Sequence, residues 1–176
     1  MIEPFRAADS RPYGKLGGFL MVLPKRKQNR LESYDYSTPG YYYLTICTQD
    51  KEKFLWNSEK LLEGKPVLSS AGLVVEKAIR DIPAHYPSVR VDLYTVMPNH
   101  IHLILQLMEG GASRECPSVS TVIGQMKRVV SKTLQRSAWQ KGFHDHVIRG
   151  EADYREIWEY IADNPRKWTE DDFYLP

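Results

Sequence analysis

The sequence has few cysteines, no long apolar run and almost no net charge, and each shortage excludes a class of protein. Cys47 and Cys116 are its two cysteines, and neither lies in a Cys-x-x-Cys pair, so we expect free thiols in a reducing compartment, with a single disulfide as the alternative. No apolar run approaches the roughly 20 residues of a membrane span, and the N-terminus has no charged-then-apolar signal pattern. We therefore expect a cytoplasmic protein with no membrane partner.

A net charge of +2 is too small to indicate nucleic-acid binding by itself, but the charge is unevenly distributed. The segment from Thr121 to Arg149 holds six basic residues and one acidic residue. Such a patch is typical of a phosphate-binding surface, although a solvated helix face is the alternative. The candidate DNA-binding residues are Lys127, Arg128, Lys132, Arg136, Lys141 and Arg149, together with Lys25 and Arg26 in a basic stretch near the N-terminus.

Length and composition predict one domain with a proper core. Hydrophobic residues make up 42% of the chain and charged residues 26%, which is ordinary for a globular protein. Residues 1–32 contain repeated glycine and proline and sustain no period, so we expect a peripheral N-terminal arm. The domain itself is predicted over 33–168, and 169–176 form a C-terminal tail.

The stretch VDLYTVMPNHIHLILQL at 91–107 is typical of two strands joined by a tight turn. Polar and apolar residues alternate before Met97, which is the period of a strand. Met97-Pro98-Asn99 then breaks the pattern, because proline fixes φ and lacks a backbone donor. One face of the second strand is suited to a core, and it consists of Ile101, Leu103, Leu105 and Leu107.

Two histidines share the other face of that second strand. His100 and His102 are same-face neighbours, and two neutral imidazoles so placed can share one divalent cation. The alternative is a pair of surface or half-buried histidines on an amphipathic strand. His144 and His146 repeat the spacing in a further predicted strand, 143–148, where a structural or DNA-contacting role is the stronger interpretation.

Periodic apolar residues predict three helices. The first follows the candidate N-caps Ser69 and Ser70, and Pro83 stops it. Its buried stripe is Val75, Ala78, Ile79 and Ile82. The second helix runs from Thr121 to about Ser137 behind Ser120 as its N-cap, with a stripe of Val122, Met126, Val129 and Thr133 and a separate row of Arg128, Lys132 and Arg136.

The last helix is predicted from about Glu151 to Asp163, because Gly150 precedes it and Pro165 follows Asn164. Its expected stripe is Tyr154, Ile157, Trp158 and Ile161. Tyr160 and Asn164 are four residues apart and therefore share a face beside that stripe.

The order of elements predicts the fold class. The aromatic and β-branched run YYYLTICT at 41–48 reads as a central strand, which gives strand, helix, strand, strand, helix, strand, helix. This order predicts an α+β sandwich with a mostly antiparallel sheet and helices packed on it. The simplest such topology is ferredoxin-like, as in RNA-recognition modules.

Several motifs, all in one order, resemble those of single-tyrosine transposases of the His-hydrophobe-His group, including the REP-associated transposases. MPNHIH at 97–102 resembles the paired-histidine motif, and WQKGFHDHVIR at 139–149 and YIADNP at 160–165 follow as in that family. The opening residues YDY at 34–36 and TICT at 45–48 fit the same pattern. The resemblance spans roughly residues 22 to 168.

The resemblance implies a metal-dependent endonuclease and strand transferase acting on single-stranded DNA next to hairpins, with 33–168 as its catalytic domain. It implies that His100 and His102 bind Mg²⁺ or Mn²⁺, that Tyr160 is the nucleophile, and that Asn164 is the third ligand, where the insertion-sequence branch usually has Gln. A 5′-phosphotyrosine intermediate would form. The resemblance places the protein in the bacterial cytoplasm, at the nucleoid when acting, and leaves monomer and homodimer both open.

Three alternatives share these residues. A non-catalytic nucleic-acid-binding module of the same fold would make the histidines structural. A domesticated transposase would still cut DNA without mobilising it. A metal-dependent phosphodiesterase with water as nucleophile would keep His100 and His102 but tolerate replacement of Tyr160 by Phe.

Overall fold

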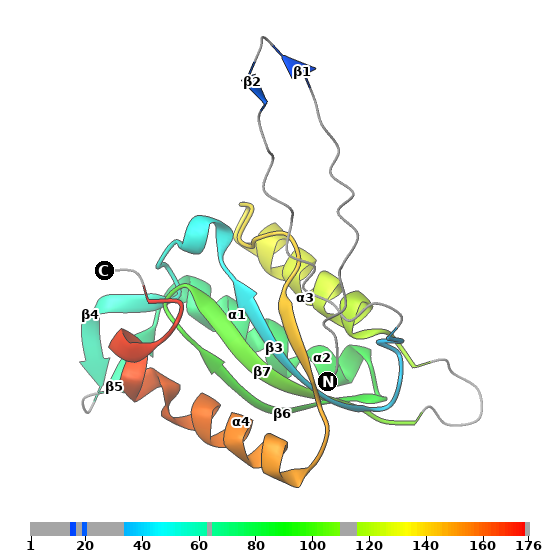
Figure 1. Ribbon diagram of the computed structural model, residues 1–176. Coiled ribbons are helices and arrows are strands. Elements are labelled where there is room, and N and C mark those ends of the chain that lie inside the picture. The colour runs from blue at the N-terminus through cyan, green and yellow to red at the C-terminus, as the bar shows by residue number, and fades with distance from the viewer. Residues whose placement is uncertain (1–14, 17–18, 21–33, 63–64, 110–115, 175–176) are drawn as a thin grey trace, which may run out of the picture.

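A computed structural model of the chain describes residues 15–16, 19–20, 34–62, 65–109 and 116–174 (Figure 1). Lys25 and Arg26, with most of the predicted arm, lie outside the described residues. Two strands of two residues within the arm, β1 (Lys15–Leu16) and β2 (Phe19–Leu20), pair antiparallel. None of the helices in the described part of the chain is long and apolar enough to span a membrane.

The centre of the fold is a four-stranded antiparallel sheet in the order β6-β7-β3-β8. Its strands are β3 (Gly40–Cys47), β6 (Val89–Val96), β7 (His100–Leu107) and β8 (His144–Ile148). The helices α1 (Ser70–Arg80) and α3 (Val119–Thr133) connect β3 to β6 and β7 to β8. This is the ferredoxin-like order, so the predicted fold class is confirmed, and YYYLTIC lies in a central strand as expected.

The two faces of the sheet are covered differently. Figure 1 shows α1 and α3 behind the sheet and α4 (Glu151–Asp163) in front of it. The face toward α1 and α3 forms the main core, as the alternation in β7 predicts, with Ile101, Leu103, Leu105 and Leu107 almost completely buried. The opposite face, under α4 and the C-terminal segment, is where the histidines of β7 lie.

Hydrogen bonds from side chains tie the front helix α4 to the sheet. Tyr154 donates to Asp92, which is the residue that interrupts the pairing register of β6 with β7. His146 of β8 contacts both carboxylate oxygens of Asp153 at 2.9 and 3.0 Å. These contacts fix the first turn of α4 and so orient the residues near its end.

The ends and faces of two predicted helices differ from expectation. The N-cap of α3 is Ser118 rather than Ser120, because the Ser118 side chain accepts from the backbone N–H of Thr121. The helix ends at Thr133 because Gln135 adopts a left-handed conformation (φ 52°), so Arg136 does not continue the basic row. Val130 is buried in place of Val129. Pro83 does not end α1, which stops at Arg80, but lies in the first turn of α2 (Ile82–His85).

The buried stripe predicted for α4 is narrower than expected, since Ile161 is buried and Trp158 is 42% exposed. The helix lies over only part of the sheet face and so buries one row of side chains. A further hairpin, β4 (Trp56–Leu62) with β5 (Lys65–Leu68), was not predicted. Short 3₁₀ helices, η1 (Gln49–Lys51) and η2 (Asn164–Glu170), complete the elements.

The close approach of α1 to the segment before β4 gives a test of the packing. A Cβ built on Gly72 would lie 2.1 Å from the carbonyl oxygen of Leu55, which is itself bonded to the Ser69 N–H. Replacing Gly72 by Ala should lower the free energy of unfolding by about 1–3 kcal/mol, because backbone must move. The matched control is Gly124→Ala in α3, where nothing lies within 4 Å and helix propensity should add about 0.5–1 kcal/mol. Urea unfolding measures both, and equal stabilities for the two variants would contradict this packing.

Candidate metal and tyrosine site

The turn between β6 and β7 places the two histidines. The backbone N–H of Met97 donates to the carbonyl oxygen of His100 at 2.9 Å, which closes the turn around Pro98 and Asn99. His100 and His102 then lie opposite Cys47 and Thr45 of the central strand β3. Both histidines are 0% exposed, so the sheet, α4 and the C-terminal segment shield them from water.

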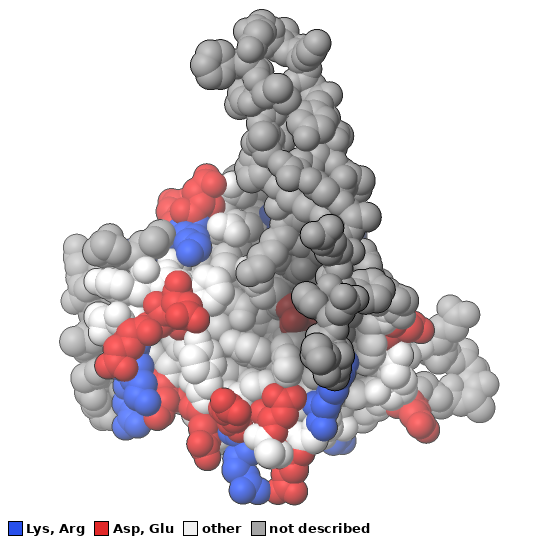
Figure 2. Space-filling model, viewed as in Figure 1, with Lys and Arg blue, Asp and Glu red and all other residues white. Residues whose placement is uncertain are grey.

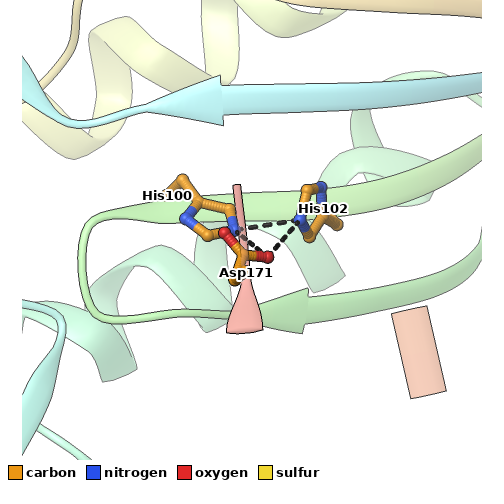
Figure 3. Close-up of side chains that lie close together, drawn as sticks. All are labelled: His100, His102 and Asp171. Carbon is orange, nitrogen blue, oxygen red and sulfur yellow. Dashed lines mark hydrogen bonds and ion pairs between the residues drawn. The ribbon is translucent and has the colours of Figure 1, made fainter. Parts of the chain in front are cut away.

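The Nε2 atoms of the two imidazole rings point toward one another and toward the carboxylate of Asp171 (Figure 3). The two Nε2 atoms are 2.9 Å apart, and Oδ2 of Asp171 is 3.8 Å from each of them. Adjacent ligands of an octahedral divalent ion are about 3 Å apart, so the two nitrogens suit neighbouring positions on one cation. In the described part of the chain this is the one group of three or more His, Cys, Asp or Glu side chains that could hold a metal ion.

Each histidine also has an outer hydrogen-bond partner. Nδ1 of His100 is 2.8 Å from Oδ1 of Asn99. Nδ1 of His102 is 2.9 Å from the hydroxyls of both Thr45 and Tyr43. Such outer partners hold a metal-binding imidazole in one orientation and one tautomer.

Burial keeps both imidazoles neutral. Loss of solvent, and then the neighbouring His102, lower the pKa of His100 to about 3, although the carboxylate of Asp171 opposes this. Burial likewise lowers the pKa of His102. A neutral imidazole is the form that binds a cation, so the pair is ready to act as a ligand at any pH near neutrality.

Asp171 connects the histidines to the end of α4. Its Oδ2 accepts from the amide Nδ2 of Asn164 at 2.8 Å, and its Oδ1 accepts from the backbone N–H of Phe173 at 2.7 Å. Burial works to raise the pKa of Asp171, but His102, the Phe173 N–H and the Asn164 amide outweigh it and hold the pKa well below the usual range. Asp171 is therefore a carboxylate whose charge is partly neutralised by its neighbours.

Asn164 is 4% exposed and its Oδ1 has no hydrogen-bond partner. Because Nδ2 faces the Asp171 carboxylate, which can only accept, the orientation of the amide is determined and Oδ1 points away from that carboxylate. A buried amide oxygen without a partner costs free energy unless something binds it. The two imidazole nitrogens and the Asp171 carboxylate form a group that could hold a divalent cation, and this unpartnered oxygen belongs to a neighbour of that carboxylate.

Tyr160 lies on the last turn of α4, next to the same groups. Its hydroxyl donates to Oδ2 of Asp171 at 3.2 Å, and its ring centroid is 5.4 Å from that of His102. The side chain is 41% exposed, so an incoming molecule can reach it. Partial burial and then the charge of Asp171 raise the pKa of Tyr160 to about 12.

A groove of about 390 Å³ borders Tyr160 along α4 and η2. Its lining includes Tyr160 and Asn164, one lysine, and the carboxylates of Glu156, Glu159, Asp163, Glu170 and Asp171. Figure 2 shows acidic side chains gathered over α4 on this face. A phosphate that approached Tyr160 along this groove would meet repulsion, unless cations neutralised the carboxylates.

The predicted basic residues divide into two groups. Lys127 donates to the carbonyl oxygens of Gln140 and Gly142 at 2.6 and 2.8 Å, and Arg136 pairs with Glu52, so both are bound within the protein. The others are exposed and make no ion pair with any residue that the structure describes, namely Arg128, Lys132, Lys141 and Arg149.

Of the second histidine pair, His146 pairs with Asp153 and His144 is exposed beside the ring of Phe173. Neither belongs to the group of described residues that could hold a metal ion. Asp171 was not predicted as a site residue, because a single Asp in a polar tail carries no spacing signal. Only the fold of η2 brings it back to the sheet.

No protein-family model matches the chain. An uncharacterised protein of Haemophilus influenzae is 28% identical over 171 residues, covering 85% of this chain and 93% of that protein. A second protein of H. influenzae, assigned as a REP-associated tyrosine transposase, is 26% identical over 146 residues, covering 76% of this chain and 74% of that protein. A solved structure of a REP-associated tyrosine transposase bound to a REP hairpin matches with a TM-score of 0.60 and 22% identity, over 79% of this chain and 74% of that one.

Buried neutral histidines predict how stability depends on pH in protein stripped of metal with EDTA. The pKa of His100 is about 3 when folded and about 6.5 when unfolded, so the unfolded state takes up the proton first as pH falls. The free energy of unfolding should be flat above about pH 7.5, and His100 alone should lower it by about 2 kcal/mol by pH 5. Urea unfolding at several pH values measures the slope.

The control for this slope is a pair of variants. His100→Gln should reduce the decline between pH 6.5 and 5 and leave the part that comes from His102, whose pKa is also lowered, whereas His85→Gln, at an exposed position in α2, should keep the whole decline. A wild-type protein whose stability does not change over this range would show that His100 is not buried in its neutral form.

Proposed function

From the similarity of this chain to REP-associated tyrosine transposases, we propose that it is a metal-dependent DNA transposase that nicks and rejoins single-stranded DNA next to hairpins. The observation that carries the proposal is the convergence of Tyr160, Asn164 and Asp171 on the His100–His102 pair. Three segments of the sequence, namely the start of β7, the end of α4 and the residues after η2, meet at one buried polar point, which packing alone does not require. The structure of the relative with its REP hairpin supports hairpin DNA as the substrate.

We propose that His100, His102 and Asn164 hold Mg²⁺ or Mn²⁺, with Asp171 as an additional acidic neighbour. The two imidazoles are neutral, and the amide oxygen is neutral too, so these three ligands would leave the positive charge of the cation uncompensated. When bound, the cation supplies Lewis-acid stabilisation of the negative charge that develops on the scissile phosphate. Asp171 offsets part of that charge and keeps the residues at the end of α4 in place.

Tyr160 is proposed as the nucleophile that replaces the 3′ oxygen on phosphorus. Attack by its Oη forms a bond to phosphorus and breaks the bond to the 3′ oxygen, which leaves as a 3′-hydroxyl after taking up a proton. The product is a 5′-phosphotyrosine. Because the phosphotyrosine bond conserves the energy of the phosphodiester, a later 3′-hydroxyl can reverse the step and join strands.

Asp171 orients Tyr160 rather than removing its proton. The pKa of Tyr160 is about 12 and that of Asp171 lies below its usual range, so the two differ by about eight pKa units or more. Full transfer of the proton from Tyr160 to Asp171 is therefore strongly unfavourable. The hydrogen bond at 3.2 Å instead holds the phenol oxygen toward the histidines. Any group that neutralises part of the charge of Asp171 makes the phenolate of Tyr160 easier to form.

The exposed cations indicate a path for the DNA backbone. The groove along α4 and η2 is lined mainly by acidic residues, and Arg128 and Lys132 lie on α3, across the sheet from the histidines. Lys141 and Arg149 flank β8, which is an edge strand of the sheet. We propose that the strand runs from α3 past the β8 edge to Tyr160, with these four cations contacting phosphates.

A covalent adduct tests the nucleophile. Wild-type protein, Tyr160→Phe and the double variant His100→Ala/His102→Ala are incubated with Mn²⁺ and end-labelled single-stranded hairpin oligonucleotides, then run on a denaturing gel. We expect an adduct with wild type only, and a loss of at least a hundredfold in both variants. Tyr86→Phe is the control, because that tyrosine is the C-cap of α2 and lies outside the helix that carries Tyr160, and it should keep the adduct. Metal-dependent cleavage that survives Tyr160→Phe would indicate a hydrolase that uses water.

Two lysines of α3 test the DNA path. Lys132→Ala should weaken hairpin binding at every sequence and reduce the slope of log affinity against log salt by about one, with stability unchanged. Lys127→Ala should instead lower the free energy of unfolding by about 1–3 kcal/mol, because it loses two bonds to the loop before β8, and should leave the salt slope unchanged. The reverse result would show that the buried lysine, and not the exposed one, contacts DNA.

A further inference from the structure

The amide of Asn99 has one allowed orientation. Its Nδ2 is 2.9 Å from the carbonyl oxygen of Phe173, and a carbonyl can only accept, so the NH₂ group faces Phe173. Oδ1 must therefore face Nδ1 of His100, which lies 2.8 Å away. The backbone supports this arrangement, because the carbonyl oxygen of Asn99 accepts from both the N–H and the hydroxyl of Thr48 at 2.9 Å.

This orientation determines the tautomer of His100. An amide oxygen cannot donate, so the proton of the contact belongs to Nδ1 of His100. In a neutral imidazole, Nε2 then carries the lone pair, and this lone pair faces His102 and Asp171. Asn99 and His100 are both 0% exposed, so no water competes for the contact.

His102 is held in a different way. The outer partners of its Nδ1 are the hydroxyls of Thr45 and Tyr43, and a hydroxyl can donate or accept. The Nε2 atoms of the two histidines are 2.9 Å apart, which without a cation requires a hydrogen between them. Because Nε2 of His100 accepts, that hydrogen belongs to Nε2 of His102, and Nδ1 of His102 accepts from a hydroxyl.

We propose that Asn99 is a positioning residue that fixes the tautomer of His100, while His102 exchanges its tautomer when a cation binds. When the Nε2 lone pairs of both histidines face a cation, the hydrogen of His102 lies on Nδ1 and is donated to Thr45 or Tyr43. The inference rests on the proposed metal-dependent function, because the two tautomers of His102 correspond to the metal-free and the cation-bound site. It assigns one histidine as the rigid ligand and the other as the adaptable one.

Nitrogen NMR of protein with ¹⁵N-labelled histidine reads the tautomers directly. Signals are assigned with His100→Gln and His102→Gln. In metal-free wild type we expect His100 to carry its hydrogen on Nδ1 and His102 on Nε2; at saturating Mg²⁺, both should carry it on Nδ1. A hydrogen on Nε2 of His100 in the metal-free protein would overturn the proposal. So would a His102 that keeps its tautomer while Mg²⁺ shifts the other signals of the site.

Two variants of Asn99 isolate its role. Asn99→Leu loses the acceptor, so His100 should populate both tautomers, and the affinity for Mn²⁺ measured by electron paramagnetic resonance should fall by roughly 10–100-fold. Asn99→Asp keeps an acceptor for His100 but cannot donate to Phe173, so it should retain the Nδ1 tautomer and near wild-type Mn²⁺ affinity. The bonds of Thr48 go to the backbone of residue 99, so both variants should keep the fold.

Unchanged His100 tautomer and Mn²⁺ affinity in Asn99→Leu would overturn the role of Asn99. The proposed function fails separately. If Mg²⁺ and Mn²⁺ do not bind, the metal dependence and the exchange at His102 are both refuted, whereas the metal-free spectra of wild type and Asn99→Leu still decide what fixes His100.

Discussion

The contact between two neutral imidazoles, 2.9 Å apart and out of reach of water, is the constraint around which the front of this protein is built. A sheet face can bury apolar side chains under a helix at no polar cost, as α1 and α3 do on the back. Burying His100 and His102 requires a partner for every ring nitrogen. The partners come from the turn before β7, from β3 and from the C-terminal segment, so the polar pair connects regions that apolar packing alone would leave independent.

The same polar contacts explain why α4 needs few apolar ones. Ile161 is its one fully buried apolar residue, and the helix is held by Tyr154 on Asp92, His146 on Asp153 and the Asn164–Asp171 pair. A helix attached in this way presents its last turn, with Tyr160, at a set distance from the histidines while leaving the tyrosine half exposed. A broader apolar interface would have buried the hydroxyl that the proposed chemistry requires.

Sequence patterns predicted the fold well because its main face obeys a simple period. The alternation in β7 and the 3.6-residue stripes of α1 and α3 report burial directly, and the order of elements then left the ferredoxin-like sheet as the simplest topology. The predictions were wrong or incomplete where local contacts, rather than a hydrophobic period, determine where an element begins or ends. Ser118 caps α3 before Ser120 can, a left-handed Gln135 separates Arg136 from its row, and the β4–β5 hairpin has neither a strong alternation nor a turn dipeptide.

The site could be predicted only as far as its residues stand close in sequence. His100 and His102 share a strand and Tyr160 and Asn164 share a helix face, so spacing brought each pair together. Asp171 carries no such signal, and Asn99, although it directly precedes His100, was interpreted only as a turn residue. One reaches the histidines because η2 turns the chain back over the sheet, and the other because a turn residue happens to have both a donor and an acceptor. The groups that set the charge and the tautomer of a site therefore emerge only from its three-dimensional contacts, even when its ligands can be identified from the sequence.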